Sequence, residues 1–241
     1  MKSLAPIHLA SWLAACCLAS CATGSTAGPA AAPRPAASAQ EGIPARPADA
    51  DADVAYYRER AAALAAGSTI EVARTNFARM RRGRMYLSGQ VAAAETGKQI
   101  ALTQAFDKSD NQAIVDITGN ILPDDQADIR AHMLRAVALR RLGRTKEADF
   151  HREAAIGLIE SIVGGGDGRS FDTAWTVYRV KEEYEVMKSR GYLVDRQSLT
   201  HHDKRDFDIL DAHKPDGSET FRAHFDITEL FAEEGRAFSR R

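Results

Sequence analysis

Apolar residues recur at intervals of three and four positions through residues 49–165, and at every second position near the C-terminal end. The first period is typical of amphipathic helices and the second of half-buried β-strands. A run of helices followed by a run of strands predicts the α+β class. We therefore expect a helical region at 49–165 and an α+β module at 166–241.

Capping residues, glycines and prolines divide the helical region into segments. In one segment, Ile70, Ala73, Phe77 and Met80 share a face and predict a continuous buried stripe. The expected helices are 49–67, 69–82, 92–110, 111–122, 125–143 and 145–164.

The last two of these helices resemble a tetratricopeptide repeat. Leu139, Leu142, Gly143, Ala148 and Ala155 match its spacing. The glycine permits the turn, and the alanines let the paired helices approach closely. The preceding pair matches more loosely. One good unit and one poor unit are too few for a solenoid, so we expect a small domain of tetratricopeptide-like hairpins.

The C-terminal module follows the sequence GGGDG at 164–168. Aromatic and β-branched residues predict its first strand, and alternating polarity predicts the others. Short polar turns between the later strands predict a small antiparallel β-meander with one or two helices. The expected strands are 170–180, 192–201, 205–213 and 219–227, and the expected helices are 180–191 and 228–238.

The composition is that of an ordinary soluble globular protein, with 44% hydrophobic and 27% charged residues among 241. The 32 basic and 33 acidic residues nearly cancel, so bulk charge gives no argument for a nucleic-acid partner, and none is expected. Aromatic residues make up only 7%, so the core must depend on alanine, leucine, isoleucine and valine.

Residues 1–21 have the layout of a secretory signal peptide: Lys2, then a run of apolar and small residues. The run also has about the minimum length of a membrane span, so an uncleaved anchor is the alternative, weakened by Pro6 and His8. Residues 22–48 contain five of the eight prolines and no hydrophobic period, which predicts a disordered linker.

The three cysteines of the chain, Cys16, Cys17 and Cys21, all lie in this leader. The sequence LASC at 18–21 resembles the lipobox of bacterial lipoproteins, in which the cysteine receives a diacylglyceryl group and becomes the new N-terminus. The sequence at 13–16 also fits. We favour Cys21, with Cys16 as the alternative, because Cys21 leaves no further thiol on the mature protein. A metal site would need ligands held by a fold, which an export signal lacks.

Lipidation predicts the subcellular location of the protein. Two or three acyl chains give stable anchoring, since each buried CH₂ contributes about 0.8 kcal/mol. The resemblance implies that Ala22, following Cys21, directs the protein to the outer membrane, facing the periplasm. The expected partners are therefore the membrane, through the lipid anchor, and a protein of the bacterial cell envelope.

A series of short motifs runs through residues 164–228: GGDGRSFDTAW, EEY, RGY, RQSL, FDIL and HFDIT. Their order and spacing resemble the bacterial domain of unknown function 4919, and the resemblance covers roughly residues 53–235. It implies an exported protein with a helical, repeat-like N-terminal half, and it supplies no catalytic residue. The family more often carries tyrosine where this chain has His224.

The motif GGGDG makes Gly166, Asp167 and Gly168 candidate ligand-binding residues at the seam between the two parts. Phosphate-binding loops of this kind run from a strand into a helix. Here the order is reversed, which favours a helix cap and a turn.

The motif EEY makes Glu182, Glu183 and Tyr184 further candidates for ligand binding. Adjacent carboxylates on a helix do not face one another. A structural role is favoured, in which the two glutamates suit the positive end of the helix dipole and the tyrosine packs inward.

Four histidines near the C-terminus, His201, His202, His213 and His224, are the weakest candidates, for a zinc or copper site. They lack a metal-binding spacing, and neighbours on a strand point to opposite faces. We predict no metal and no cofactor.

The cluster RTNFARMRRGR carries five arginines. The favoured interpretation is a solvated helix end, and the alternative is attraction to anionic lipid or cell-wall polymer. The arginines are Arg74, Arg79, Arg81, Arg82 and Arg84.

Two functional classes remain. The favoured one is a non-enzymatic binding or scaffolding protein of the envelope. The alternative is an envelope hydrolase with its site at the seam near GGGDG. A deep cleft at the seam would favour the enzyme, and a concave helical face with apolar residues would favour the binder.

Overall fold

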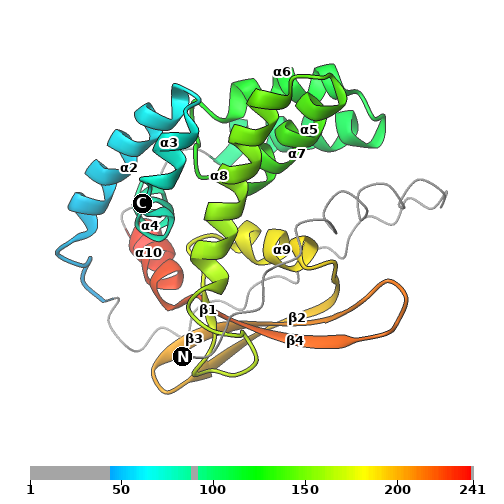
Figure 1. The fold of residues 1–241 in the computed structure, drawn as a ribbon. Helices are drawn as coiled ribbons and strands as arrows, with labels where there is room; N and C mark the ends of the chain where they lie inside the picture. Colours follow the sequence, from blue (N-terminus) through cyan, green and yellow to red (C-terminus); the bar gives the residue numbers. More distant parts are fainter. Residues whose placement is uncertain (1–43, 88–91, 240–241) are drawn as a thin grey trace, which may run out of the picture.

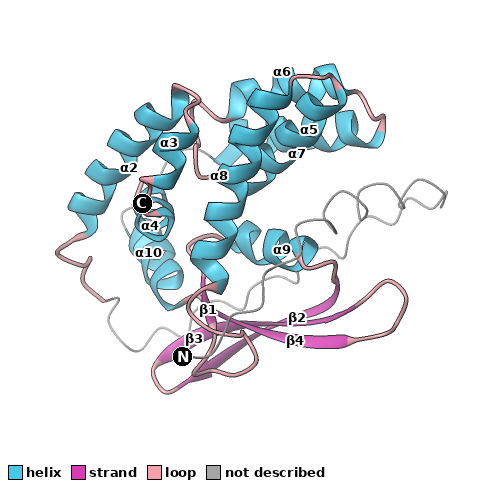
Figure 2. Cartoon of the chain, viewed as in Figure 1, coloured by secondary structure: helices cyan, strands magenta, loops and turns pink. Residues whose placement is uncertain are grey.

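The computed structural model describes residues 44–87 and 92–239 (Figure 1). The predicted signal peptide, Cys16, Cys21 and most of the predicted linker lie outside these residues. The α+β class is confirmed, since helices come first and a four-stranded sheet with flanking helices follows (Figure 2). Within the described part of the chain, no helix is long and apolar enough to span a membrane.

The helical part forms a row in which α5 packs on α6, α6 on α7 and α7 on α8, while α2 packs along α4. Gly143 adopts a φ of 77° at the α7–α8 turn, a conformation that glycine reaches without steric cost. The helices are Ala50–Ala65 (α2), Thr69–Ala73 (α3), Phe77–Met85 (α4), Ala92–Asp107 (α5), Asn111–Ile121 (α6), Ile129–Arg141 (α7) and Thr145–Val163 (α8).

The prediction of a single helix at 69–82 is wrong, because the chain forms two helices there, α3 and α4. Asn76 caps α4 by accepting a hydrogen bond from the backbone N–H of Arg79 at 3.1 Å. Such a cap stabilises a new helix by about 1 kcal/mol and rotates the chain before it. As a result Phe77 is buried, as expected, whereas Ile70 is 62% exposed.

The sheet has the order β1-β4-β3-β2. Strands β2, β3 and β4 form the expected antiparallel meander. The first strand differs from the expectation, because it has only two residues and runs parallel to β4, with Trp175 opposite Phe225. The elements are Trp175–Thr176 (β1), Val180–Ser189 (α9), Leu193–His202 (β2), Arg205–His213 (β3), Thr220–Asp226 (β4) and Thr228–Ser239 (α10).

The observed strand β1 is shorter than the strand predicted at 170–180, because the chain before Trp175 turns back on itself. The backbone N–H of Gly168 donates to the carbonyl of Thr173 at 2.9 Å, which closes a loop instead of extending a strand. Beyond β1, the backbone N–H of Val177 donates to the carbonyl of Asp226 at 3.2 Å. Strand β1 therefore pairs with β4 only over a short stretch.

One hydrophobic core crosses from the helices to the sheet. It includes Met80 of α4, Leu158 of α8, Val186 of α9 and Phe225 of β4, all fully buried. Helix α8 runs from the row of hairpins down to β1 and passes through this core (Figure 1). A second core, which includes Leu139, lies among α5, α6, α7 and the start of α8.

Candidate functional site

The helical part and the sheet module meet at a buried ion pair. Nη1 of Arg81 on α4 donates to Oε2 of Glu182 on α9 at 2.7 Å, and each side chain is 1% exposed. Nε of Arg81 donates to Oγ of Ser161 on α8 at 2.9 Å, and Nη2 donates to the carbonyl of Thr176 on β1 at 3.5 Å. Burial raises the pKa of Glu182, but Arg81 and Arg179 lower it more, so its pKa lies below the usual range.

A second group of charges surrounds Asp125 in the loop between α6 and α7. Its carboxylate accepts from Nη1 of Arg179 at 2.5 Å and lies 3.3 Å from both Nε of Arg84 and Nζ of Lys181. Lys181 also donates to Asp128 at 3.0 Å. Burial raises the pKa of Asp125, but the three cations outweigh burial and hold its pKa well below the usual range. These groups fill the seam with paired charges.

The three residues of the EEY motif contact different partners. Glu182 belongs to the ion pair at the seam, and Glu183 is fully buried beside it in the chain. The hydroxyl of Tyr184 donates to Oε1 of Gln197 on β2 at 2.7 Å, and Nε2 of Gln197 donates to the buried Asp208 on β3 at 2.8 Å. Burial, with the charges of Glu183 and Asp208, raises the pKa of Tyr184.

The GGGDG loop packs against a buried tryptophan. Gly168 has a φ of 69°, and a Cβ there would lie 2.7 Å from the indole ring of Trp175. A Cβ on Gly166 would lie 2.2 Å from the carbonyl oxygen of Thr173. The carboxylate of Asp167 accepts from Oγ1 of Thr173 at 2.5 Å, which fastens the turn. Both glycines are therefore required for close packing at the end of α8.

Two of the four C-terminal histidines pair with aspartates, and the other two contact one phenylalanine ring. His201 and His213 each lie within 3 Å of an aspartate, at 2.9 and 2.8 Å. His202 stacks on the ring of Phe171 at 4.3 Å between centroids, and His224 meets the same ring edge-on at 5.1 Å. Among the described residues, no three potential metal ligands come together.

The arginine cluster does not form the expected solvated helix end. Because α4 packs along α2 and against α8, and meets α9 at Arg81, its basic side chains reach carboxylates. Arg81 and Arg84 are 1% and 6% exposed, whereas Arg74 is 68% exposed. Arg79 and Arg82 pair with Asp49, Asp53 and Glu229 at 2.6 to 2.8 Å.

A chain of hydrogen bonds that the sequence did not indicate links α7 to α8. Nε of Arg135 donates to Nε2 of His151 at 2.9 Å, and the Nδ1 atoms of His151 and His132 are 3.0 Å apart. Nε2 of His132 lies 3.1 Å from the carbonyl of Gln126. Since an arginine only donates, one arrangement satisfies every contact: His151 carries its proton on Nδ1 and His132 on Nε2. Both histidines must be neutral.

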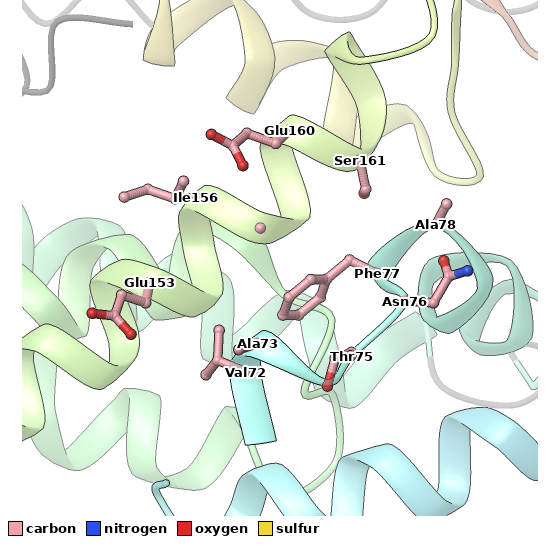
Figure 3. A pocket seen from close by; sticks show the side chains of 11 residues that line it. Val72, Ala73, Thr75, Asn76, Phe77, Ala78, Glu153, Ile156, Glu160 and Ser161 are labelled. Atoms are coloured by element: carbon pink, nitrogen blue, oxygen red, sulfur yellow. The ribbon is translucent and has the colours of Figure 1, made fainter. Parts of the chain in front are cut away.

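An open cleft of about 500 Å³ lies between α8 and the turn from α3 to α4. In Figure 3, Glu153, Ile156 and Glu160 follow one another along α8, and Val72 and Phe77 come from the opposite wall. Val72, Phe77 and Ile156 are apolar. The two glutamates make the α8 wall acidic. We call this feature the α3–α8 cleft.

The walls of the α3–α8 cleft are held in place by two features. A Cβ on Gly157 of α8 would lie 2.4 Å from the ring of Phe77, so the glycine lets the two walls approach. Ser161 lines the cleft and accepts from Arg81, which connects α4 and α8. The cleft is therefore preformed and depends on the ion pair behind it.

These features define an α+β protein in which helical hairpins and a mixed sheet share a buried ionic seam. A family model described as "Domain of unknown function (DUF4919)" matches residues 85–236. The match covers more than half of the chain, and the chain belongs to this family. No curated protein and no solved structure matches the chain.

The histidine chain predicts that the protein loses stability as the pH falls below 7. Burial lowers the pKa of His132 to about 4, and burial with the neighbouring charges lowers that of His151 to about 2. Histidines in an unfolded chain have a pKa of about 6.5, so below that pH the unfolded state binds more protons and is favoured. We expect the free energy of unfolding to fall by about 2.5 to 3 kcal/mol between pH 7.5 and 5.5, which is about 1.3 kcal/mol for each histidine.

Urea unfolding at the two pH values measures this loss. The His151→Gln variant should show roughly half of it. His201→Gln, changed at an exposed position on β2 outside this chain of hydrogen bonds, is the control and should retain most of it. An equal loss in wild type and His151→Gln would contradict the assignment.

Proposed function

We propose that the chain is a lipid-anchored protein of the bacterial cell envelope whose folded part is a non-enzymatic binding module. The membrane anchor is Cys21, with Cys16 as the alternative, and the outer membrane facing the periplasm is the proposed location. The tetratricopeptide-like pair α7–α8 contributes one wall of the binding site. The proposed partner is another protein of the envelope.

The position of the α3–α8 cleft carries this proposal. It opens on the helical face and is lined by apolar groups and two carboxylates. The hydrolase alternative needs its site at the seam, where Arg81, Glu182, Arg179 and Asp125 form paired charges with little exposure. A preformed concave surface of this kind favours binding, because less freedom is lost when a ligand is ordered on it.

Ser161 illustrates why the cleft favours binding over acyl transfer. Its hydroxyl donates to the carbonyl of Leu158 at 2.6 Å and accepts from Arg81. A serine nucleophile needs a base that accepts its proton, and this proton is already directed to a backbone oxygen. The hydroxyl therefore serves to link α8 to α4 through its hydrogen bond from Arg81.

The anchor is tested by exchanging the two candidate cysteines in the full chain. Wild type and Cys16→Ser should incorporate labelled palmitate, and Cys21→Ser should not, because the acylated N-terminal residue is lost. Mass spectrometry of the mature N-terminus should find an acylated Cys21. The reverse pattern would move the anchor to Cys16, and an intact Met1 would contradict lipidation.

The binding role is tested by cross-linking from the α3–α8 cleft in intact membranes. A photoreactive benzoylphenylalanine at Ala73, which lines the cleft, should yield a discrete protein adduct. The same group at Ala55, an exposed position on α2, is the control and should not. Identical adducts from both positions, or none from Ala73, would contradict a binding role for the cleft.

A further inference from the structure

The α3–α8 cleft combines apolar lining residues with a net acidic charge. Its eleven lining residues, all within the described part, include Glu153 and Glu160 and no basic side chain. Arg152 approaches Glu153 at 4.0 Å, but it also lies 3.8 Å from Asp149 and is shared between the two. Arg81, behind the cleft wall, is neutralised by Glu182. The cleft therefore presents negative charge to a ligand.

Exposed apolar groups continue the apolar lining of the cleft. Ala73 is an exposed lining residue on α3. Ile70, three residues before it on the same helix, is 62% exposed. Residues three apart on a helix lie on one face, so Ile70 extends the apolar strip beyond the cleft. The break at Asn76, which turned α3 away from α4, is what leaves both side chains at the surface.

The spacing of the two carboxylates sets the geometry of a complementary ligand. Glu153 and Glu160 are seven residues apart on α8, which places them about 10 Å apart along the helix axis. In a polyproline II segment, which has three residues per turn and a rise of about 3.1 Å per residue, residues three positions apart lie on the same side and about 9 Å apart. Ile156 lies between the two carboxylates, where the aliphatic stems of the two cations would cover it (Figure 3).

We propose that the α3–α8 cleft binds a basic segment of a partner protein in the polyproline II conformation, with two arginine or lysine residues three positions apart and an apolar residue between them. The cations pair with Glu153 and Glu160 on either side of Ile156, and the apolar residue between them is directed to the opposite wall, against Phe77. This assignment rests on the proposed binding role and adds the chemistry of the ligand. A small polycation shares the charge of such a segment but has no apolar side chain for the apolar lining.

The test measures peptide binding to the purified full-length protein by fluorescence anisotropy. The probe is a labelled peptide with the core Arg-Ala-Leu-Arg, and the matched probe has glutamine in place of both arginines. The double variant Glu153→Gln, Glu160→Gln should bind the arginine probe about fivefold or more weakly, since each exposed pair contributes up to about 1 kcal/mol. The glutamine probe should bind wild type with a similar loss.

The control variant is Glu59→Gln, Glu147→Gln, which removes the same charge from exposed positions outside the cleft. It should bind the arginine probe like wild type. Equal weakening in both double variants, no binding of the arginine probe, or competition by spermidine as strong as by the unlabelled peptide would each overturn the assignment. If the cross-linked adduct at Ala73 persists in that case, the ligand class fails and the binding role stands.

Discussion

The ion pair between Arg81 and Glu182 is the constraint on which the arrangement of the molecule depends. The two residues are 101 positions apart, and each is almost completely buried. A buried charge without its partner costs several kcal/mol, so α4 and α9 can meet at this point only when both charges are present and aligned. Because the same guanidinium also donates to α8 and β1, the pair fixes the helical part against the sheet as well as joining two helices.

The surface that we assign to binding follows from this internal arrangement. Ser161 belongs both to the contacts of Arg81 and to the lining of the α3–α8 cleft, so the ion pair sets the position of α8 relative to α4. The charges at the seam are used within the fold, whereas Glu153 and Glu160 lie on the α8 wall of the cleft. The protein thus separates carboxylates that stabilise its interior from carboxylates available to a ligand.

Local patterns in the sequence predicted the class and most elements, because period and capping are local properties. The strands β2, β3 and β4 and the helices α8 and α9 follow those patterns closely. The break at Asn76 was also encoded locally, as a capping residue, but the apolar stripe from Ile70 to Met80 outweighed it. The burial of Arg81 and Arg84 could not be predicted, since their partners lie far away in the chain and only the packed fold brings them together. The α3–α8 cleft depends on that same packing.

A double-mutant cycle on the ion pair tests the central claim most directly. Arg81→Met, Glu182→Gln and the double variant are compared with wild type by urea unfolding at pH 7. Glu182→Gln should cost about 3 to 5 kcal/mol, because it leaves the buried Arg81 unpaired. Arg81→Met should cost less, because Arg179 still lies 3.4 Å from Glu182. The double variant should cost clearly less than the sum. If a single variant does not fold, the double variant should still have the higher melting temperature. Additive costs, or a double variant less stable than both single variants, would contradict a pair that holds the two parts of the protein together.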